Sequence, residues 1–193
     1  NNTGYKGIWY TRSAAIGEAA TTRIVYQNIV VGYNAGIWYE FNDSLIEVTG
    51  SFIYNNTIYS ANGTDDGIYV DHTFTNTEVF NNIIWGRNPY LRYDDNVTIG
   101  WGTKPVSYSD YNSVYSSLTN GFGCNYGHGG TLYSSLATWI DSGIPCRPTN
   151  YDDNSITTDP GLVNPGGSSP EDYKRTSYPT NGRGGSYASV MGA

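Results

Sequence analysis

The chain is poor in charged residues and has no long hydrophobic run. Asp, Glu, Lys and Arg make up 14% of its 193 residues, and 17 acidic against 10 basic residues give a formal net charge of −7. Lysines and arginines form no cluster along the chain, which argues against a surface that follows nucleic-acid phosphates. The longest apolar stretches, such as residues 29–31, are far too short to cross a bilayer. The sequence therefore predicts neither a nucleic-acid nor a membrane partner.

The composition does not favour a helical bundle either. The chain contains 24 Gly and 19 Tyr, together with many Asn, Ser and Thr. Gly, Asn, Ser and Thr lower helix propensity, whereas Tyr and Thr suit strands and Gly and Asn suit tight turns. We therefore expect an all-β fold, and the length is sufficient for one domain with a buried core.

Cysteine is also scarce, with only Cys124 and Cys146, which enclose 21 residues. A disulfide between them would stabilise the fold by about 3 kcal/mol in the chain-entropy model, and two free buried thiols are the alternative. Asn-X-Ser/Thr sequons add candidate glycosylation sites. They include Asn42, Asn55, Asn62 and Asn96. Together these features favour a secreted or cell-surface protein.

A repeat is the main signal in the sequence. Four segments share a pattern in which an asparagine precedes aliphatic or small residues, and their central asparagines are 28, 26 and 30 residues apart. These asparagines are Asn28, Asn56, Asn82 and Asn112. A second family of segments lies out of phase with the first, at spacings of 29, 31 and 23 residues. Its aliphatic positions are Ile8, Ile37, Ile68 and Leu91. Two interleaved patterns with one shared period predict a coil with short strands at fixed places on each turn.

The repeat also predicts which side chains face inward. Strand residues alternate between two faces, so the four aliphatic residues of the second family are expected to point into the core. Equivalent positions on successive turns of such a coil stack about 4.8 Å apart. We therefore expect the four asparagines to form a ladder in which each side-chain amide bonds to the next.

Several of these segments resemble those of a known superfamily. Asn-Asn-Ile-Ile at residues 81–84 and Gly-Ile-Tyr-Val at residues 67–70 look like coils of right-handed parallel β-helix proteins, the pectate-lyase-like superfamily. Residues 158–165 (Thr-Asp-Pro-Gly-Leu-Val-Asn-Pro) and the end Met191-Gly192-Ala193 resemble the closing segment of many bacterial secreted β-helix proteins. The resemblance covers residues 5–116 and 155–193. It implies a β-helix of about four to five coils with a loop-rich C-terminal cap. The superfamily includes polysaccharide lyases, glycoside hydrolases, epimerases, phage tailspikes and adhesins, so the fold alone does not determine the activity.

The expected organisation has three parts. Residues 1–116 are predicted to form the coils, residues 117–155 a disulfide-closed loop or subdomain packed on their side, and residues 156–193 the closing segment. Leu132, Leu136, Trp139 and Ile140 recur at helical spacing, which predicts one short helix. A coil pattern already begins at Gly7, with no cap visible before it, and an end coil needs a cap. We therefore expect either a missing N-terminal portion or a first coil that stacks on a partner, by self-association or on another chain.

One outer face is predicted to carry the functional residues. If the aliphatic residues of the second family face inward, the residues that follow them face outward as an aromatic column with one arginine. This column consists of Trp9, Trp38, Tyr69 and Arg92. Two residues further along comes a column with three acids, made by Thr11, Glu40, Asp71 and Asp94. Sugars stack their C–H faces on aromatic rings and donate hydroxyl hydrogen bonds to carboxylates.

This face gives the candidate site residues. Stacked carboxylates either raise one another's pKa values or recruit a cation such as Ca²⁺. We therefore name Glu40, Asp71 and Asp94 as candidate catalytic residues, with Asp71 and Asp94 as candidate Ca²⁺ ligands. The aromatic column with Arg92 is the candidate substrate-binding surface. Outward acids that only keep the protein soluble, and aromatic residues packed under a loop, are the alternative.

The sequence is compatible with three functions. The first is a secreted enzyme that acts on polysaccharide, as a lyase or a glycoside hydrolase. The second is a carbohydrate-binding module that uses the aromatic face without catalysis. The third is a structural subunit of an extracellular filament, adhesin or tailspike, stacked through its first coil. The sequence favours an association with polysaccharide.

Overall fold

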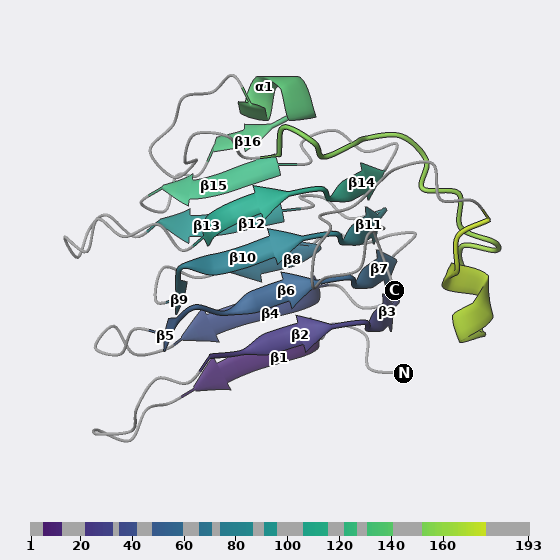
Figure 1. Cartoon of the computed structure of the whole chain (residues 1–193), viewed down its shortest axis with the longest axis horizontal. Coiled ribbons are helices and arrows are strands. Elements are labelled where there is room, and N and C mark those ends of the chain that lie inside the picture. Colours follow the sequence, from purple (N-terminus) through teal and green to yellow (C-terminus); the bar gives the residue numbers. More distant parts are fainter. Residues whose placement is uncertain are drawn as a thin grey trace.

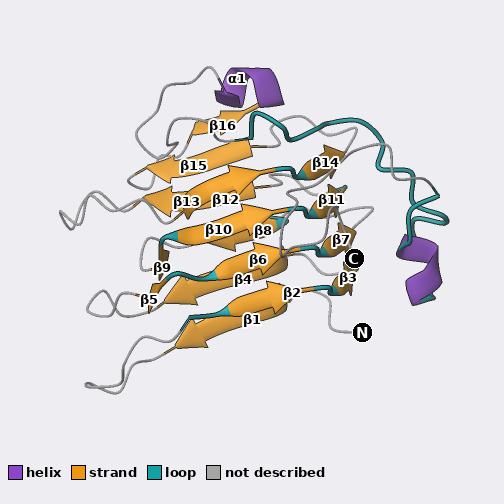
Figure 2. Ribbon diagram, viewed as in Figure 1, coloured by secondary structure: helices purple, strands orange, loops and turns teal. Residues whose placement is uncertain are grey.

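A computed structural model of the chain describes residues 6–12, 22–32, 35–41, 48–59, 66–70, 74–86, 91–95, 106–115, 122–126, 131–140 and 152–176. Strands predominate in these residues, as Figure 2 shows, and helix is limited to two short pieces. The strands are β1 Lys6–Arg12, β2 Ile24–Tyr26, β3 Ile29–Val31, β4 Ala35–Phe41, β5 Val48–Thr49, β6 Phe52–Tyr54, β7 Thr57–Tyr59, β8 Ile68–Val70, β9 Phe74–Thr75, β10 Thr77–Phe80, β11 Ile83–Trp85, β12 Leu91–Asp95, β13 Val106–Asp110, β14 Ser113–Tyr115, β15 Phe122–Tyr126 and β16 Thr131–Tyr133. The helices are α1 Leu136–Ile140 and the 3-10 helix η2 Pro170–Tyr173. The all-β prediction is confirmed, and α1 lies where the helical spacing predicts a short helix.

Most strands belong to three sheets of parallel strands. In Figure 1 the strands of each sheet are stacked one above the other, and β3, β7, β11 and β14 stand apart at the right. Sheet A has the order β1-β4-β8-β12-β15-β16, sheet B the order β2-β6-β10-β13 and sheet C the order β3-β7-β11-β14. All pairs in these sheets are parallel except β15–β16, and β5 and β9 form a further small parallel sheet. The parallel pairs of these three sheets join strands that lie one repeat apart in the sequence. This arrangement is compatible with a parallel β-helix. No helix in the described part of the chain is long and apolar enough to cross a membrane.

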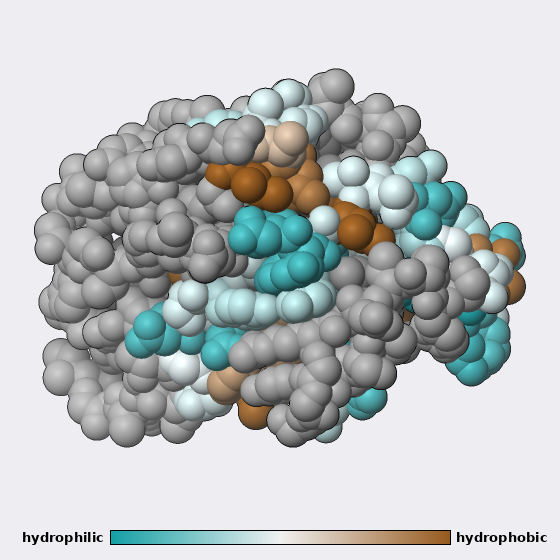
Figure 3. Space-filling model, turned by 45° about the horizontal axis from the view of Figure 1, so that its top comes forward, coloured by the Kyte–Doolittle hydropathy of each residue, from teal (hydrophilic) through white to brown (hydrophobic). Residues whose placement is uncertain are grey.

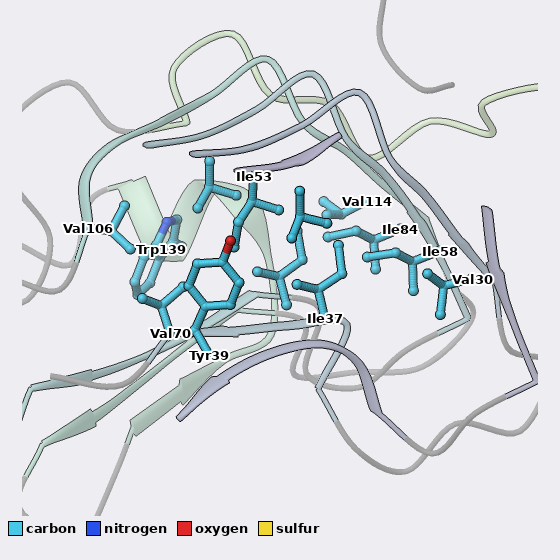
Figure 4. Packing of buried hydrophobic residues seen from close by; sticks show 13 residues of the cluster. Val30, Ile37, Tyr39, Ile53, Ile58, Val70, Ile84, Val106, Val114 and Trp139 are labelled. Atoms are coloured by element: carbon cyan, nitrogen blue, oxygen red, sulfur yellow. The ribbon is translucent and has the colours of Figure 1, made fainter. Parts of the chain in front are cut away.

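A hydrophobic core lies between the three sheets, and their buried side chains point toward one another in Figure 4. Each sheet contributes the inward residues of consecutive strands, which are in register: Val25, Ile53 and Val79 from sheet B, Val30, Ile58, Ile84 and Val114 from sheet C, and Ile37 and Ile68 from sheet A. Burial of each such side chain contributes about 1.5–3 kcal/mol. Ile37 and Ile68 are fully buried and Ile8 packs against the core, as the repeat predicts. Leu91 pairs with Ile68 in the backbone register, but its side chain lies outside the described part of the chain.

The predicted asparagine ladder is confirmed. The side-chain Nδ2 of Asn28 donates to Oδ1 of Asn56 at 3.0 Å, and the backbone N of Asn28 donates to the same atom at 3.1 Å. Asn56 bonds to Asn82, and Asn82 to Asn112, with the same two distances. The residue before each asparagine has a φ near +55°, and this residue is Gln27, Asn55, Asn81 or Tyr111. The left-handed turn before each rung therefore repeats at every step of the ladder.

A different set of side chains ends the ladder. The backbone N of Asn112 donates to Oγ of Ser155 at 2.9 Å, so a serine stands where the next asparagine would be. Ser155 Oγ in turn donates to Oδ1 of Asp152 at 2.8 Å, and Ser109 Oγ donates to the same oxygen at 2.9 Å. Asp152 is fully buried. Residues 152–156 thus close the ladder at the end opposite to Asn28.

The segment after Ser155 covers the outer side of sheet C. Ile156 forms a parallel bridge with Ser113, and Leu162 and Tyr173 form a second apolar cluster with Ile83. The 3-10 helix η2 follows an N-cap at Ser169 in a reciprocal capping box with Asp172. Figure 1 shows this segment passing from the β14 end of sheet C down to η2.

Candidate functional site

The aromatic residues named from the sequence form one row across sheet A. In the backbone register, Trp9 of β1 pairs with Trp38 of β4, Trp38 pairs with Tyr69 of β8, and Tyr69 pairs with Arg92 of β12. Their inward neighbours Ile37 and Ile68 are fully buried. Since successive side chains of a strand point to opposite faces, the three aromatic side chains of the row lie on the outer face of sheet A.

The exposure of this row falls from one end to the other. Trp9 is 50% exposed, Trp38 is partly exposed, and Tyr69 is 6% exposed. The rings of Trp38 and Tyr69 stack with centroids 4.2 Å apart and planes inclined by 28°. Because this contact covers one face of each of these two rings, Trp9 is the member of the row with the most surface open to a ligand.

The acidic column can be followed only in the backbone. Thr11 pairs with Glu40, and Asp94 pairs with Asn125 on the neighbouring strand β15. The side chains of Glu40, Arg92 and Asp94, and the whole of Asp71, lie outside the described residues. The part of the chain that the structure describes holds no group of three or more His, Cys, Asp or Glu side chains suited to a metal ion. The catalytic and Ca²⁺-binding roles of the acids therefore stay predictions.

The structure describes only some of the residues in the predicted disulfide and the predicted glycosylation sites. Cys124 lies in β15, where its backbone pairs with Tyr93 and Thr131, while Cys146 lies outside the described residues. The disulfide stays a prediction. Asn42, Asn62 and Asn96 also lie outside the described residues. Asn55 is only 3% exposed and takes part in the left-handed turn before Asn56, whereas N-linked glycans are carried at the surface.

A second aromatic row, on sheet B, was not recognised from the sequence as a surface feature. Tyr26 pairs with Tyr54 and Tyr54 with Phe80, and their rings are nearly parallel, with centroids 5.3 and 5.2 Å apart. Tyr108 continues the row edge-on to Phe80 at 6.2 Å. The signal was present in the sequence, because Tyr26, Tyr54 and Phe80 each stand two positions before a ladder asparagine. Exposure again decreases along the row, from 50% at Tyr26 to none at Phe80.

Three of the large hydrophobic residues that are well exposed lie on the edge strands of sheets A and B. Trp9 of β1 is 50% exposed, and Ile24 and Tyr26 of β2 are 51% and 50% exposed. A fourth, Val163, lies on the segment after Ser155. Each of the first three pairs in register with a less exposed residue on the next strand of its sheet. Exposed apolar surface is therefore concentrated on the edge strands β1 and β2.

Asp152 and Tyr39 are two of the buried titratable groups outside these rows with perturbed pKa values. Burial raises the pKa of the Asp152 carboxyl, while hydrogen bonds from Trp139, Ser155 and Ser109 act in the opposite direction. Burial also raises the pKa of the Tyr39 hydroxyl, and the nearby Tyr10 raises it further. Both groups face the core side of their strands or the end of the ladder. A perturbed pKa here reflects packing and not access to a substrate.

A small cavity of about 240 Å³ lies between β3 and the segment that contains η2. It is lined by Ile29, Val31, Gly167, Ser168, Ser169, Pro170 and Tyr173. Its volume is below the range usual for ligand pockets, and Tyr173 is its sole titratable lining residue. Hydrophobic and hydrophilic residues adjoin on the described part of the face shown in Figure 3. The described residues thus offer two aromatic rows and one small cavity, which has a single titratable lining residue.

Comparisons of the chain with protein-family models, with curated proteins and with solved structures gave no match.

Proposed function

We propose that this chain is a secreted right-handed parallel β-helix of the pectate-lyase-like type that associates with polysaccharide through the outer face of sheet A. The observation that carries this proposal is the row Trp9–Trp38–Tyr69, which is in register on three strands and half exposed at Trp9. The rows of a parallel sheet repeat about every 4.8 Å. A polymer whose units repeat at a short distance can contact several strands of such a sheet at once, which a single small molecule cannot do.

The chemistry of this face suits a sugar. An indole ring offers an apolar surface to the C–H face of a pyranose, and its N–H donates to a hydroxyl. Glu40 stands two residues after Trp38 in the sequence of β4, and carboxylates accept hydrogen bonds from sugar hydroxyls. Trp9, with the largest open area, is the residue on which binding is expected to depend most.

Catalysis is the further step of this proposal. Glu40, Asp71 and Asp94 would serve as acid, base or nucleophile, and Asp71 and Asp94 would hold Ca²⁺ if the reaction is that of a lyase. Arg92, in line with Tyr69, would contact substrate. Binding without turnover is the simpler form of the same proposal, because it requires only the aromatic row.

The binding test uses affinity electrophoresis in gels that contain soluble neutral or acidic polysaccharides. A polysaccharide that binds the native chain slows its migration in the gel, and Trp9→Ala is expected to abolish this effect. The melting temperature of the variant should be nearly unchanged, because Trp9 is half exposed. Val163→Ala removes a similarly exposed apolar residue elsewhere and is the matched control. Equal retardation of the Trp9 variant and the native chain would remove sheet A from the proposal.

A turnover assay separates the enzyme from the binding module. Product release is measured with the same polysaccharides, with and without Ca²⁺, for the native chain and for a variant with Glu40, Asp71 and Asp94 all changed to Ala. Product that disappears in the variant places catalysis on the acidic column. Retardation in the gel with no product from the native chain assigns a binding role.

A second candidate function is assembly through the first coil, formed by β1, β2 and β3. The exposure pattern favours it, because Trp9, Ile24 and Tyr26 are all on this coil and each has a more buried or only partly exposed neighbour on the next one. A further coil stacked on β1, β2 and β3 would cover these side chains in the same way.

A further inference from the structure

The hydrogen bonds of the ladder all run in one direction. Asn28, Asn56 and Asn82 each use the backbone N and Nδ2 to donate to Oδ1 of the asparagine on the next coil. An Oδ1 therefore always accepts from the preceding coil. Asn28, on the first coil, donates to Asn56 in this way, and no described residue donates to its own Oδ1. The ladder thus begins with an open acceptor.

The amide of Asn28 lacks a second contact that the other rungs have. The Nδ2 groups of Asn56, Asn82 and Asn112 each donate to a backbone carbonyl of the preceding coil at 3.0 Å. Those carbonyls belong to Val25, Ile53 and Val79. Asn28 bonds to the carbonyl of Tyr26 on its own coil, as Asn56 does to that of Tyr54, but it has no such bond to a preceding coil in the described residues. A preceding coil would supply both a donor for Oδ1 and an acceptor for Nδ2.

Among the described residues, the backbone N–H groups of β2 and β3 also lack the acceptors that equivalent groups on the next coil find on the coil before them. Phe52 N donates to Arg23 O and Thr57 N donates to Asn28 O, both at 2.8 Å, across the contact between the first two coils. Ile24 and Ile29 occupy the equivalent positions on the first coil, because they pair in register with Phe52 and Thr57. Their N–H groups therefore point to the side of β2 and β3 on which no described strand lies.

The opposite end of the ladder, at Ser155 and Asp152, has side chains that are already hydrogen-bonded to one another. Ser155 accepts from Asn112, Asp152 accepts from Ser155, and the indole of Trp139 closes the other side of this carboxylate. On sheet A the last pair, β15 with β16, is antiparallel and ends the parallel stacking. A second copy of this chain could not present an open rung of donors from that end.

Two copies also fit poorly with their first coils together. Each would bring an Oδ1 acceptor at Asn28 and neither would bring the donor that this atom receives elsewhere in the ladder. Their strands would meet in antiparallel fashion, whereas all contacts within sheets B and C are parallel. The aromatic row of sheet B would then lose its in-register continuation beyond Tyr26.

We infer that the edge formed by β2, β3 and Asn28 is a docking surface for the end coil of another, parallel β-solenoid chain, whose last rung supplies a side-chain amide donor to Asn28 Oδ1. This inference rests on the assembly candidate above and adds the chemistry of the partner. The partner coil has two short strands joined at an asparagine. It bonds through its carbonyls to the N–H groups of Ile24 and Ile29, and it covers Ile24 and Tyr26 with apolar or aromatic side chains.

The chain itself provides a probe for this surface. A synthetic peptide with the sequence of residues 50–59 contains β6, the turn and β7, including Asn56, and so represents one such coil. A matched peptide carries Asn56→Asp, which keeps the shape of the side chain and removes the Nδ2 donor. Both are titrated into the full chain labelled with ¹⁵N. Amide shifts report binding, and hydrogen exchange at Ile24 and Ile29 reports where it occurs.

The native peptide is expected to bind and to slow exchange at Ile24 and Ile29, and the Asp peptide is expected to bind at least about tenfold more weakly, as the loss of one buried amide donor predicts. A chain variant with Asn28→Leu should bind the two peptides equally. Equal binding of both peptides to the native chain would retain stacking but overturn the role of the donor. No binding of either would overturn the assembly candidate as well.

Sedimentation of the chain alone tests the choice of partner. A monomer is expected. A dimer that protects the amides of Ile24 and Ile29 would replace the foreign coil by a second copy and would overturn the inference. Since no glycan is present in any of these measurements, their failure is distinguishable from failure of the polysaccharide proposal, which depends on Trp9 in the gel assay.

Discussion

The indole Nε1 of Trp139 donates to Oδ2 of Asp152 at 2.9 Å, and both residues are fully buried. The other oxygen of the same carboxylate accepts from Ser109 and Ser155. One side chain therefore joins α1, β13 and the last rung of the asparagine ladder. Its burial makes the end of the ladder sensitive to the protonation of a single group.

Replacement of this carboxylate should change how stability depends on pH. Burial raises the pKa of Asp152 in the folded chain above its value in the unfolded chain. The folded state therefore binds the proton more tightly, and the stability due to this group is fully present below the unfolded pKa and is lost as the pH rises through the raised pKa. Asp152→Asn does not titrate. Urea unfolding of both proteins from pH 3 to pH 8 should show the native chain losing stability relative to the variant as the pH rises, whereas a constant difference would contradict the prediction.

Loss of an internal rung should cost more than loss of the first one. Asn82→Ala removes the Oδ1 that accepts from Asn56, and the Nδ2 that donates to Asn112 and to the carbonyl of Ile53, in a fully buried place. Each polar group left buried without a partner costs about 1–3 kcal/mol, so the free energy of unfolding should fall by at least about 3 kcal/mol. Asn28→Ala is the control, because Asn28 is only partly buried and accepts from no described residue. Urea unfolding measures both, and equal losses would argue against a cooperative ladder.

Two glycines should respond very differently to a methyl group. A Cβ on Gly36 would lie 2.3 Å from the backbone oxygen of Gly67 and 2.6 Å from Cγ2 of Ile58, so β4 could not keep its distance from the next coil. Gly32 has a φ of +75° and open space around it, so Gly32→Ala costs only the strain of a left-handed residue, about 1–2 kcal/mol. Gly36→Ala is expected to lower the free energy of unfolding by clearly more than Gly32→Ala. A thermal melt in which Gly36→Ala is the milder change would show that β4 can shift without loss.

The parts of this fold that recur are the parts that the sequence predicts. Four asparagines at nearly constant spacing predict the ladder, because only stacked equivalent positions place their amides within bonding distance. The inward orientation of Ile37 and Ile68 follows from strand alternation once the period is known. The outer row Trp9–Trp38–Tyr69 follows from the same argument, since a register that places the isoleucines inside places their neighbours outside.

The parts that occur once could not be predicted in this way. Ser155 takes the place of an asparagine, and it lies 43 residues after Asn112. The spacing of the repeat could not predict this residue, because a long insertion separates it from Asn112 and interrupts the period. The bond between Trp139 and Asp152 depends on where α1 lies, and no periodicity places it. The stacking of Trp38 on Tyr69, which decides how much ring surface stays exposed, depends on side-chain rotamers and not on spacing.

The segment after Ser155 should stabilise sheet C chiefly through Tyr173. This side chain is 2% exposed, its ring lies 5.5 Å from that of Tyr59, and its hydroxyl donates to the carbonyl of Gly167 at 2.7 Å. Tyr173→Ala should lower the free energy of unfolding by about 3–5 kcal/mol, the usual cost of removing a buried aromatic ring. Tyr173→Phe keeps the ring and should cost only about 1 kcal/mol, the net value of one hydrogen bond.

Hydrogen exchange shows where the effect of Tyr173→Ala arises. If the segment acts as a cover, exchange in this variant should rise first in β7 and β11, whose outer side chains Tyr59 and Ile83 pack with Leu162 and Tyr173. Strands of sheet B, on the other side of the core, should keep their protection until global unfolding. Val163→Ala, at a 54% exposed position of the same segment, is the control and should change stability by less than about 0.5 kcal/mol. A uniform rise in exchange over sheets B and C would mean that the segment belongs to one cooperative unit with the coils, and that sheet C does not open without the rest.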